Sequence, residues 1–121
     1  FPALQPRKRW KGIRIDSLDD LVANKTMAMI ERHAPKDVVD LYYLMTKKGY
    51  RSKRILHLTE KKFGPRLPES LFWSQAALAD RDLQEATFVF IGDKRKDQQL
   101  REDVHQFVVQ QSNKFLLPHL H

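Results

Sequence analysis

The chain has 121 residues, of which 41% are hydrophobic, so there is room for one compact domain and its core. No apolar run approaches the roughly 20 residues that span a bilayer, and we expect no membrane partner. The absence of cysteine excludes disulfides and thiolate metal sites and is typical of a cytoplasmic protein. A formal net charge of +7 favours an anionic partner, such as nucleic acid or nucleotide phosphates.

The first eleven residues are expected to form a basic linker. The opening Phe1–Pro6 contains two prolines and reads as an extended segment, so we expect the chain to be the C-terminal part of a larger protein. A basic run that surrounds one aromatic residue follows, and its side chains are candidates for binding RNA by charge and stacking. The run consists of Arg7, Lys8, Arg9, Trp10 and Lys11. The alternative is a solvated loop.

Residues 12–121 are expected to form a single, mostly helical α+β domain with one or two short strands. The alternation of apolar and charged residues predicts a strand at Gly12–Ile15, and β-branched and aromatic residues predict another at Thr87–Ile91. The second strand, or a sheet outside this chain, would supply a partner for the first.

Capping residues, prolines and glycines predict five helices between and after these strands. They run from Leu18 to about Arg32, from Pro35 or Lys36 to about Lys47, from a Ser52 cap to Gly64, from Pro68 and Glu69 through Leu78, and from Lys96 to about Phe115.

The first of these helices carries a lysine within its apolar stripe. On a helical wheel Lys25 falls among Leu18, Leu21, Val22, Ala28 and Met29. A lysine at such a position either extends its ammonium to water at the edge of the helix or meets a buried anion.

The second helix carries two aspartates beside its apolar seam. Asp37 and Asp40 are three residues apart and therefore share one side of the helix with Leu41 and Leu44. Carboxylates at an apolar seam are costly unless they are paired, solvated or bound to metal. Asp37 also lies in the first turn, where it complements the helix dipole, and Asp40 is able to pair with a nearby lysine.

The two helices are joined by a tight turn at Pro35, which predicts that their charged residues approach one another. The set comprises Lys25, Arg32, Lys36, Asp37 and Asp40. Phosphoryl and nucleotidyl transfer depend on positioning and charge neutralisation: cations hold a triphosphate, and carboxylates bind Mg²⁺ or orient a hydroxyl. The sequence therefore indicates a phosphate-transfer site as one reading and structural ion pairs as the other.

Two segments resemble the AbiEii/AbiGii-type nucleotidyltransferase toxin family. Ile13–Lys25 is similar to a strand followed by a helix of the form Asp-Leu-x-x-x-Lys, and Arg32–Leu44 is similar to an arginine followed by Lys-Asp-x-x-Asp-Leu. The likeness is clearest over residues 12–44 and looser beyond them.

The resemblance implies a polymerase-β-like nucleotidyltransferase with a helical C-terminal region, acting as a toxin in a toxin–antitoxin or phage-defence pair. It implies nucleotide transfer from a nucleoside triphosphate onto RNA, such as tRNA, with Mg²⁺ as cofactor and an antitoxin protein as partner. By position, Lys25 and Arg32 would bind the nucleotide, and Asp37 and Asp40 would be the acidic residues of the site.

Family members also carry, earlier in the chain, a Gly-Ser or Gly-Gly turn and a metal-binding acidic pair on a strand. Nothing before Gly12 supplies either feature, and the histidines show no ligand spacing, so we assign no metal ligand. We expect a missing N-terminal half to complete the site and this chain alone not to catalyse transfer. The alternative is a free-standing basic helical module that binds nucleic acid or a protein partner.

Overall fold

The computed structural model describes residues 8–10, 13–15, 17–87 and 92–116. They form two short strands and five helices. The elements are β1 (Lys8–Trp10), β2 (Ile13–Ile15), α1 (Leu18–Arg32), α2 (Pro35–Lys47), α3 (Ser52–Phe63), α4 (Glu69–Glu85) and α5 (Lys94–Leu116). The expectation of a mostly helical fold is confirmed.

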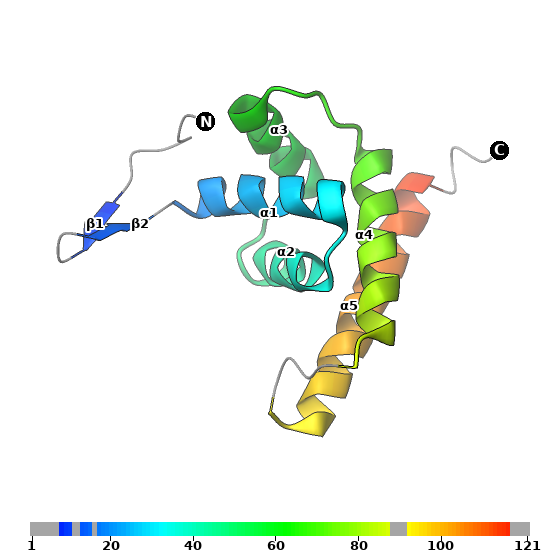
Figure 1. Cartoon of the computed structure of the whole chain (residues 1–121). Coiled ribbons are helices and arrows are strands. Elements are labelled where there is room, and N and C mark those ends of the chain that lie inside the picture. Colours follow the sequence, from blue (N-terminus) through cyan, green and yellow to red (C-terminus); the bar gives the residue numbers. More distant parts are fainter. Residues whose placement is uncertain (1–7, 11–12, 16, 88–91, 117–121) are drawn as a thin grey trace.

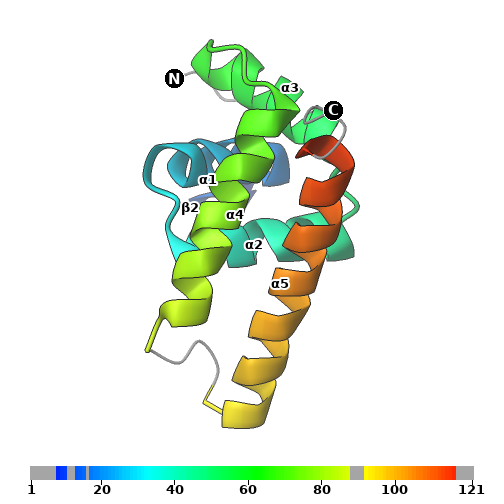
Figure 2. The same ribbon diagram turned by 90° about the vertical axis from the view of Figure 1, so that its right-hand side faces the viewer.

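The other four helices pack around α4, which contacts each of them. Figure 1 shows α1 and α2 stacked to the left of the long α4–α5 pair, with α3 at the same end as the start of α4. Viewed from the side, α4 and α5 run next to each other along the whole body (Figure 2). The helices α1 and α2 form the hairpin that the turn at Pro35 predicts, and they pack against each other.

The two strands pair with each other ahead of the helical body. β1 and β2 are antiparallel, with Lys8 opposite Ile15 and Trp10 opposite Ile13. Figure 1 shows this hairpin beyond the N-terminal end of α1. β1 therefore lies within the segment that was expected to be a linker. It pairs with β2, for which the sequence analysis expected Thr87–Ile91 or an external sheet as the partner. Thr87 is in no strand, and residues 88–91 lie outside the described part of the chain.

Local sequence signals explain where the helices begin and end. The Ser17 hydroxyl accepts a hydrogen bond from the Asp20 amide at 3.1 Å and caps α1. His33 closes α1 in a left-handed conformation with φ of 40°, and Pro35 then opens α2. Gly64 follows α3 with φ of 101°, a conformation that favours glycine. Ser52, expected as a cap, is instead the first residue of α3, and its hydroxyl donates to Glu69 at 2.7 Å.

The core lies where α4 meets the other helices, and its largest fully buried side chains are Trp73, Phe72, Met29, Leu41 and Ile55. The prediction of an apolar stripe on α1 is wrong in part, because Leu18 is 46% exposed and Leu21 is 38% exposed. The buried face of α1 is displaced toward Asp19, Ala23 and Thr26. No helix in the described part of the chain is both long and apolar enough to cross a membrane.

Candidate functional site

The α1–α2 hairpin brings together the lysine and both aspartates singled out in the sequence. The ammonium Nζ of Lys25 lies 2.9 Å from Asp40 Oδ2 and 3.8 Å from Asp37 Oδ1. Lys25 occupies the middle of α1, whereas both aspartates lie in the first half of α2. We call these three side chains the Lys25 site.

The three side chains of the Lys25 site differ in their exposure to solvent. The Asp37 side chain is 9% exposed, Lys25 33% and Asp40 45%. The hydrogen bond from Lys25 to Asp40 raises the pKa of the lysine above its ordinary value, against the opposing effect of burial. Lys25 is therefore a permanent cation at neutral pH, and one side of it remains open to a ligand.

Further positive charge surrounds the Lys25 site. Arg32 ends α1 with an exposed side chain, and its charge partly opposes the rise in the pKa of Lys25. Lys36 is exposed in the first turn of α2, which has Ala34 as N-cap and so no side-chain cap bond. An uncapped helix N-terminus adds partial positive charge beside the cations. Three cations and two aspartates thus lie on this hairpin, and Asp37 offsets part of the positive charge of the α2 N-terminus.

Metal binding requires more oxygen ligands than the Lys25 site provides. Mg²⁺ takes six ligands, and an aspartate whose oxygen already bonds an ammonium contributes few of them. Within the described residues, no group of three or more potential ligand side chains is placed to hold a metal ion. The site therefore fits a role in holding phosphate better than a role as a complete metal centre.

The basic run stands apart from the Lys25 site in the fold. Lys8, Arg9 and Trp10 form β1 in the N-terminal hairpin, whereas Arg7 and Lys11 lie outside the described residues.

A second charged network, between α1 and α3, was missed by the sequence analysis. Asp19 and Asp20 lie in the first turn of α1, where carboxylates complement the helix dipole, yet both are buried. Asp19 accepts a hydrogen bond from the Tyr50 hydroxyl, and Asp20 lies 3.5 Å from the buried ammonium of Lys62. The sequence did contain a signal for a buried lysine. Lys62 lies on the same face of α3 as Ile55, at the spacing of successive helical turns.

An Asp-x-Asp pair also escaped the sequence analysis. Asp80 and Asp82 lie on α4, where the first is 2.7 Å from His105 Nδ1 and the second 3.2 Å from His33 Nδ1. Side chains two apart on a helix do not face each other. This pair consequently differs from a strand-borne pair that binds metal, and each carboxylate has a structural histidine partner.

A comparison with protein families supports the resemblance that the segments around the Lys25 site carry. Residues 3–117 match the model of the family described as "Nucleotidyl transferase AbiEii toxin, Type IV TA system". No curated protein and no solved structure matched the chain. Because the match covers nearly the whole sequence and includes both halves of the α1–α2 hairpin, the chain belongs to the AbiEii nucleotidyl transferase toxin family.

Proposed function

We propose that the Lys25 site binds the triphosphate of a nucleotide that a toxin of a toxin–antitoxin pair transfers to an acceptor. The observation that carries this proposal is the cluster of Lys25, Asp37 and Asp40, with Lys25 held as an open cation. Family membership supports the reaction class, and the geometry supports the role of these three side chains.

Each residue has a distinct part in the proposal. Lys25 contacts the phosphates, and Arg32 adds charge at the open rim of the site. Asp40 is the distal acidic residue, because it is the more exposed of the two carboxylates and orients the ammonium at 2.9 Å. Asp37 is buried in the first turn of α2 and fixes the position of Lys25 from the buried side of the site. Charge neutralisation of this kind is the main contribution that a protein makes to phosphoryl transfer.

Mg²⁺ belongs to the proposal as the cofactor that neutralises the triphosphate. Its principal carboxylate ligands come, in this proposal, from a nucleotidyltransferase domain outside these 121 residues. Asp40, the more exposed of the two aspartates, would support the ion from the Lys25 site. We infer that this chain by itself does not catalyse transfer, and that the complete nucleotidyltransferase acts in the cytoplasm, on RNA, under the control of an antitoxin protein.

The test is nucleotide transfer by the complete protein that contains this chain. Labelled nucleotide incorporated into RNA is measured for the wild type and for Lys25→Ala and Asp40→Ala. Loss of one phosphate-stabilising group is expected to lower the rate by about a hundredfold or more. Lys96→Ala, which removes an exposed lysine from the first turn of α5, is the matched control and is expected to retain the wild-type rate.

The competing function is a nucleic-acid-binding or protein-binding module in which Lys25 and the aspartates are only structural. Under that reading both substitutions lower the melting temperature and leave transfer at the wild-type rate in the folded protein. Circular dichroism measured on the same samples separates the two cases. Wild-type transfer rates in folded Lys25→Ala and Asp40→Ala would remove the nucleotide-binding role.

A further inference from the structure

A groove on another face of the molecule combines cations with an aromatic floor. Its larger part is a pocket of about 670 Å³ between the end of α2, the starts of α3 and α4 and the end of α5. A second pocket of about 500 Å³ lies between α3 and the start of α4. Lys53 and Glu69 line both pockets, so the two pockets lie next to each other. We call the two pockets together the α3–α5 groove.

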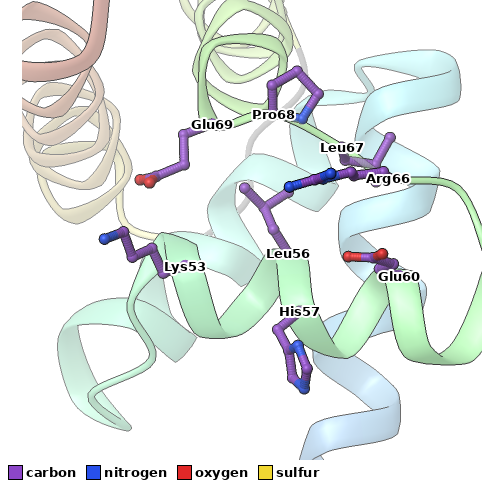
Figure 3. Close-up of a pocket in the computed structure, with 8 residues that line it drawn as sticks. All are labelled: Lys53, Leu56, His57, Glu60, Arg66, Leu67, Pro68 and Glu69. Carbon is purple, nitrogen blue, oxygen red and sulfur yellow. The ribbon is translucent and has the colours of Figure 1, made fainter.

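Cations outnumber carboxylates along this groove. Arg51, Lys53 and Lys114 line the larger part, and Arg66 lines the smaller part. Figure 3 shows the guanidinium of Arg66 extending over Leu56, with Lys53 and Glu69 at the other end of the pocket. Four basic side chains therefore face Glu60 and Glu69, and the Ser52 hydroxyl donates a hydrogen bond to Glu69 at 2.7 Å. The surface attracts an extended anion.

The floor of the larger pocket is aromatic. Phe107 and Phe115 are eight residues apart on α5, which places them about 12 Å apart along the helix axis. Phe115 stacks on the buried Trp73 with ring centroids 6.0 Å apart, and Phe107 contacts the same ring edge-on at 6.0 Å. Both phenylalanines are only partly buried, so each ring is fixed from behind and keeps an accessible side. Rigid rings of this kind provide stacking surfaces for bases.

We propose that the α3–α5 groove binds a single-stranded segment of RNA. Phosphates lie against Arg51, Lys53, Arg66 and Lys114, and bases lie against Phe107 and Phe115. Basic grooves with aromatic platforms are the general means of binding single strands without sequence preference. An acidic protein partner would satisfy the cations, but it would leave the stacking surfaces without a specific role.

The groove and the Lys25 site both include residues of α2 but lie on different sides of that helix. Asp40 belongs to the Lys25 site and Met45 lines the groove, and the two residues are about 8 Å apart along the helix axis and roughly 140° apart around it. Resting on the proposed function, we identify the bound strand as a segment of the acceptor RNA that continues around α2 to the nucleotide.

The experiment measures binding of a short fluorescein-labelled uridine homopolymer to this chain by fluorescence anisotropy, without nucleotide or metal. The double variant Lys53→Glu/Lys114→Glu is expected to bind about tenfold or more weakly than the wild type. The slope of log affinity against log salt, between about 50 and 200 mM, is expected to fall by about 1.4, since each phosphate contact on a single strand contributes about 0.7. Phe115→Leu is expected to weaken binding by roughly fivefold to a hundredfold.

Two controls make the result decisive. Arg81→Glu changes the same kind of charge in a different pocket, between α4 and α5, and is expected to bind the strand like the wild type. Lys25→Ala is likewise expected to leave strand binding unchanged, so a failure of the nucleotide site and a failure of the groove are separate results. Equal affinities for Lys53→Glu/Lys114→Glu and Arg81→Glu would overturn the proposal. Tighter binding of a duplex than of the single strand would overturn it as well.

Discussion

The hydroxyl of Tyr50 lies 2.5 Å from Asp19 Oδ1, and this contact joins the segment just before α3 to the first turn of α1. Arg54 completes the junction, because its guanidinium is 3.4 Å from the same carboxylate oxygen and lies over the Tyr50 ring. Burial, together with the hydrogen bond and charge of Asp19, raises the pKa of Tyr50 to about 12. The buried pair of Asp20 and Lys62 lies between the same two helices.

Removing the Tyr50 hydroxyl is expected to destabilise the fold in a pH-dependent way. A hydrogen bond to a buried charge stabilises a protein by about 2 kcal/mol, so Tyr50→Phe should lower the free energy of unfolding by about that amount at pH 8. The folded pKa lies above the unfolded value of about 10, so this stabilisation is complete below pH 10 and is lost as the pH rises toward 12.

Urea denaturation of the wild type and Tyr50→Phe at several pH values measures this effect. The stability difference between the two proteins should shrink between pH 10 and 12. Tyr43→Phe is the control, because Tyr43 is 41% exposed and its loss should leave stability nearly unchanged. A difference that stays constant with pH would show that the Tyr50 hydroxyl does not stabilise the fold through Asp19.

The buried ion pair of Asp20 and Lys62 is expected to be sensitive to removal of one partner. Both side chains are less than a tenth exposed, so Lys62→Met removes a buried cation from beside Asp20, which also accepts a hydrogen bond from the Ser17 hydroxyl, and should cost about 3 kcal/mol. Lys61→Met, at the exposed neighbouring position, should change stability by less than about 0.5 kcal/mol. Adding Asp20→Asn to Lys62→Met should recover part of the loss, and a fully additive double-mutant cycle would contradict the pairing.

Arg101 joins α5 to the end of α4 in a way that lysine cannot reproduce. Its guanidinium lies 2.8 Å from Asp97 and donates to the main-chain oxygens of Leu83 and Ala86. Because an ammonium lacks this planar array of donors, Arg101→Lys should destabilise the protein by about 1–3 kcal/mol in thermal unfolding. Arg95→Lys, at an exposed site in the first turn of α5, is the control. Equal melting temperatures for the two variants would refute the role of Arg101.

The sequence predicts the helices well because their ends carry local chemical signals. Ser17, Pro35 and Gly64 each act through the residues next to them, so the boundaries follow without knowledge of the fold. The approach of Lys25 to Asp37 and Asp40 was predictable for a similar reason, since one tight turn joins the two helices.

Long-range contacts were not predictable in this way. The exposure of Leu18 and Leu21 depends on which side of α1 is covered by α3, and their hydrophobicity alone does not reveal it. Asp19 pairs with residues more than thirty positions away, so its first-turn position suggests only the helix dipole. The α3–α5 groove is likewise assembled from four helices, and its residues form no pattern along the chain.

Lys25 is expected to contribute little to stability. Its ion pair with Asp40 is partly exposed, and pairs of this kind stabilise proteins by at most about 1 kcal/mol. Lys25→Met should therefore lower the free energy of unfolding by less than about 1 kcal/mol in urea denaturation. A loss of several kcal/mol would instead assign the lysine a structural role.

The measurement that tests the central claim most directly is single-turnover nucleotide transfer by the full-length protein with Lys25 changed to Arg or to Met. If Lys25 holds the triphosphate, the cationic Lys25→Arg should keep part of the rate, and Lys25→Met should lose about a hundredfold or more. Equal rates for the wild type and a folded Lys25→Met would contradict the assignment of the Lys25 site to the nucleotide.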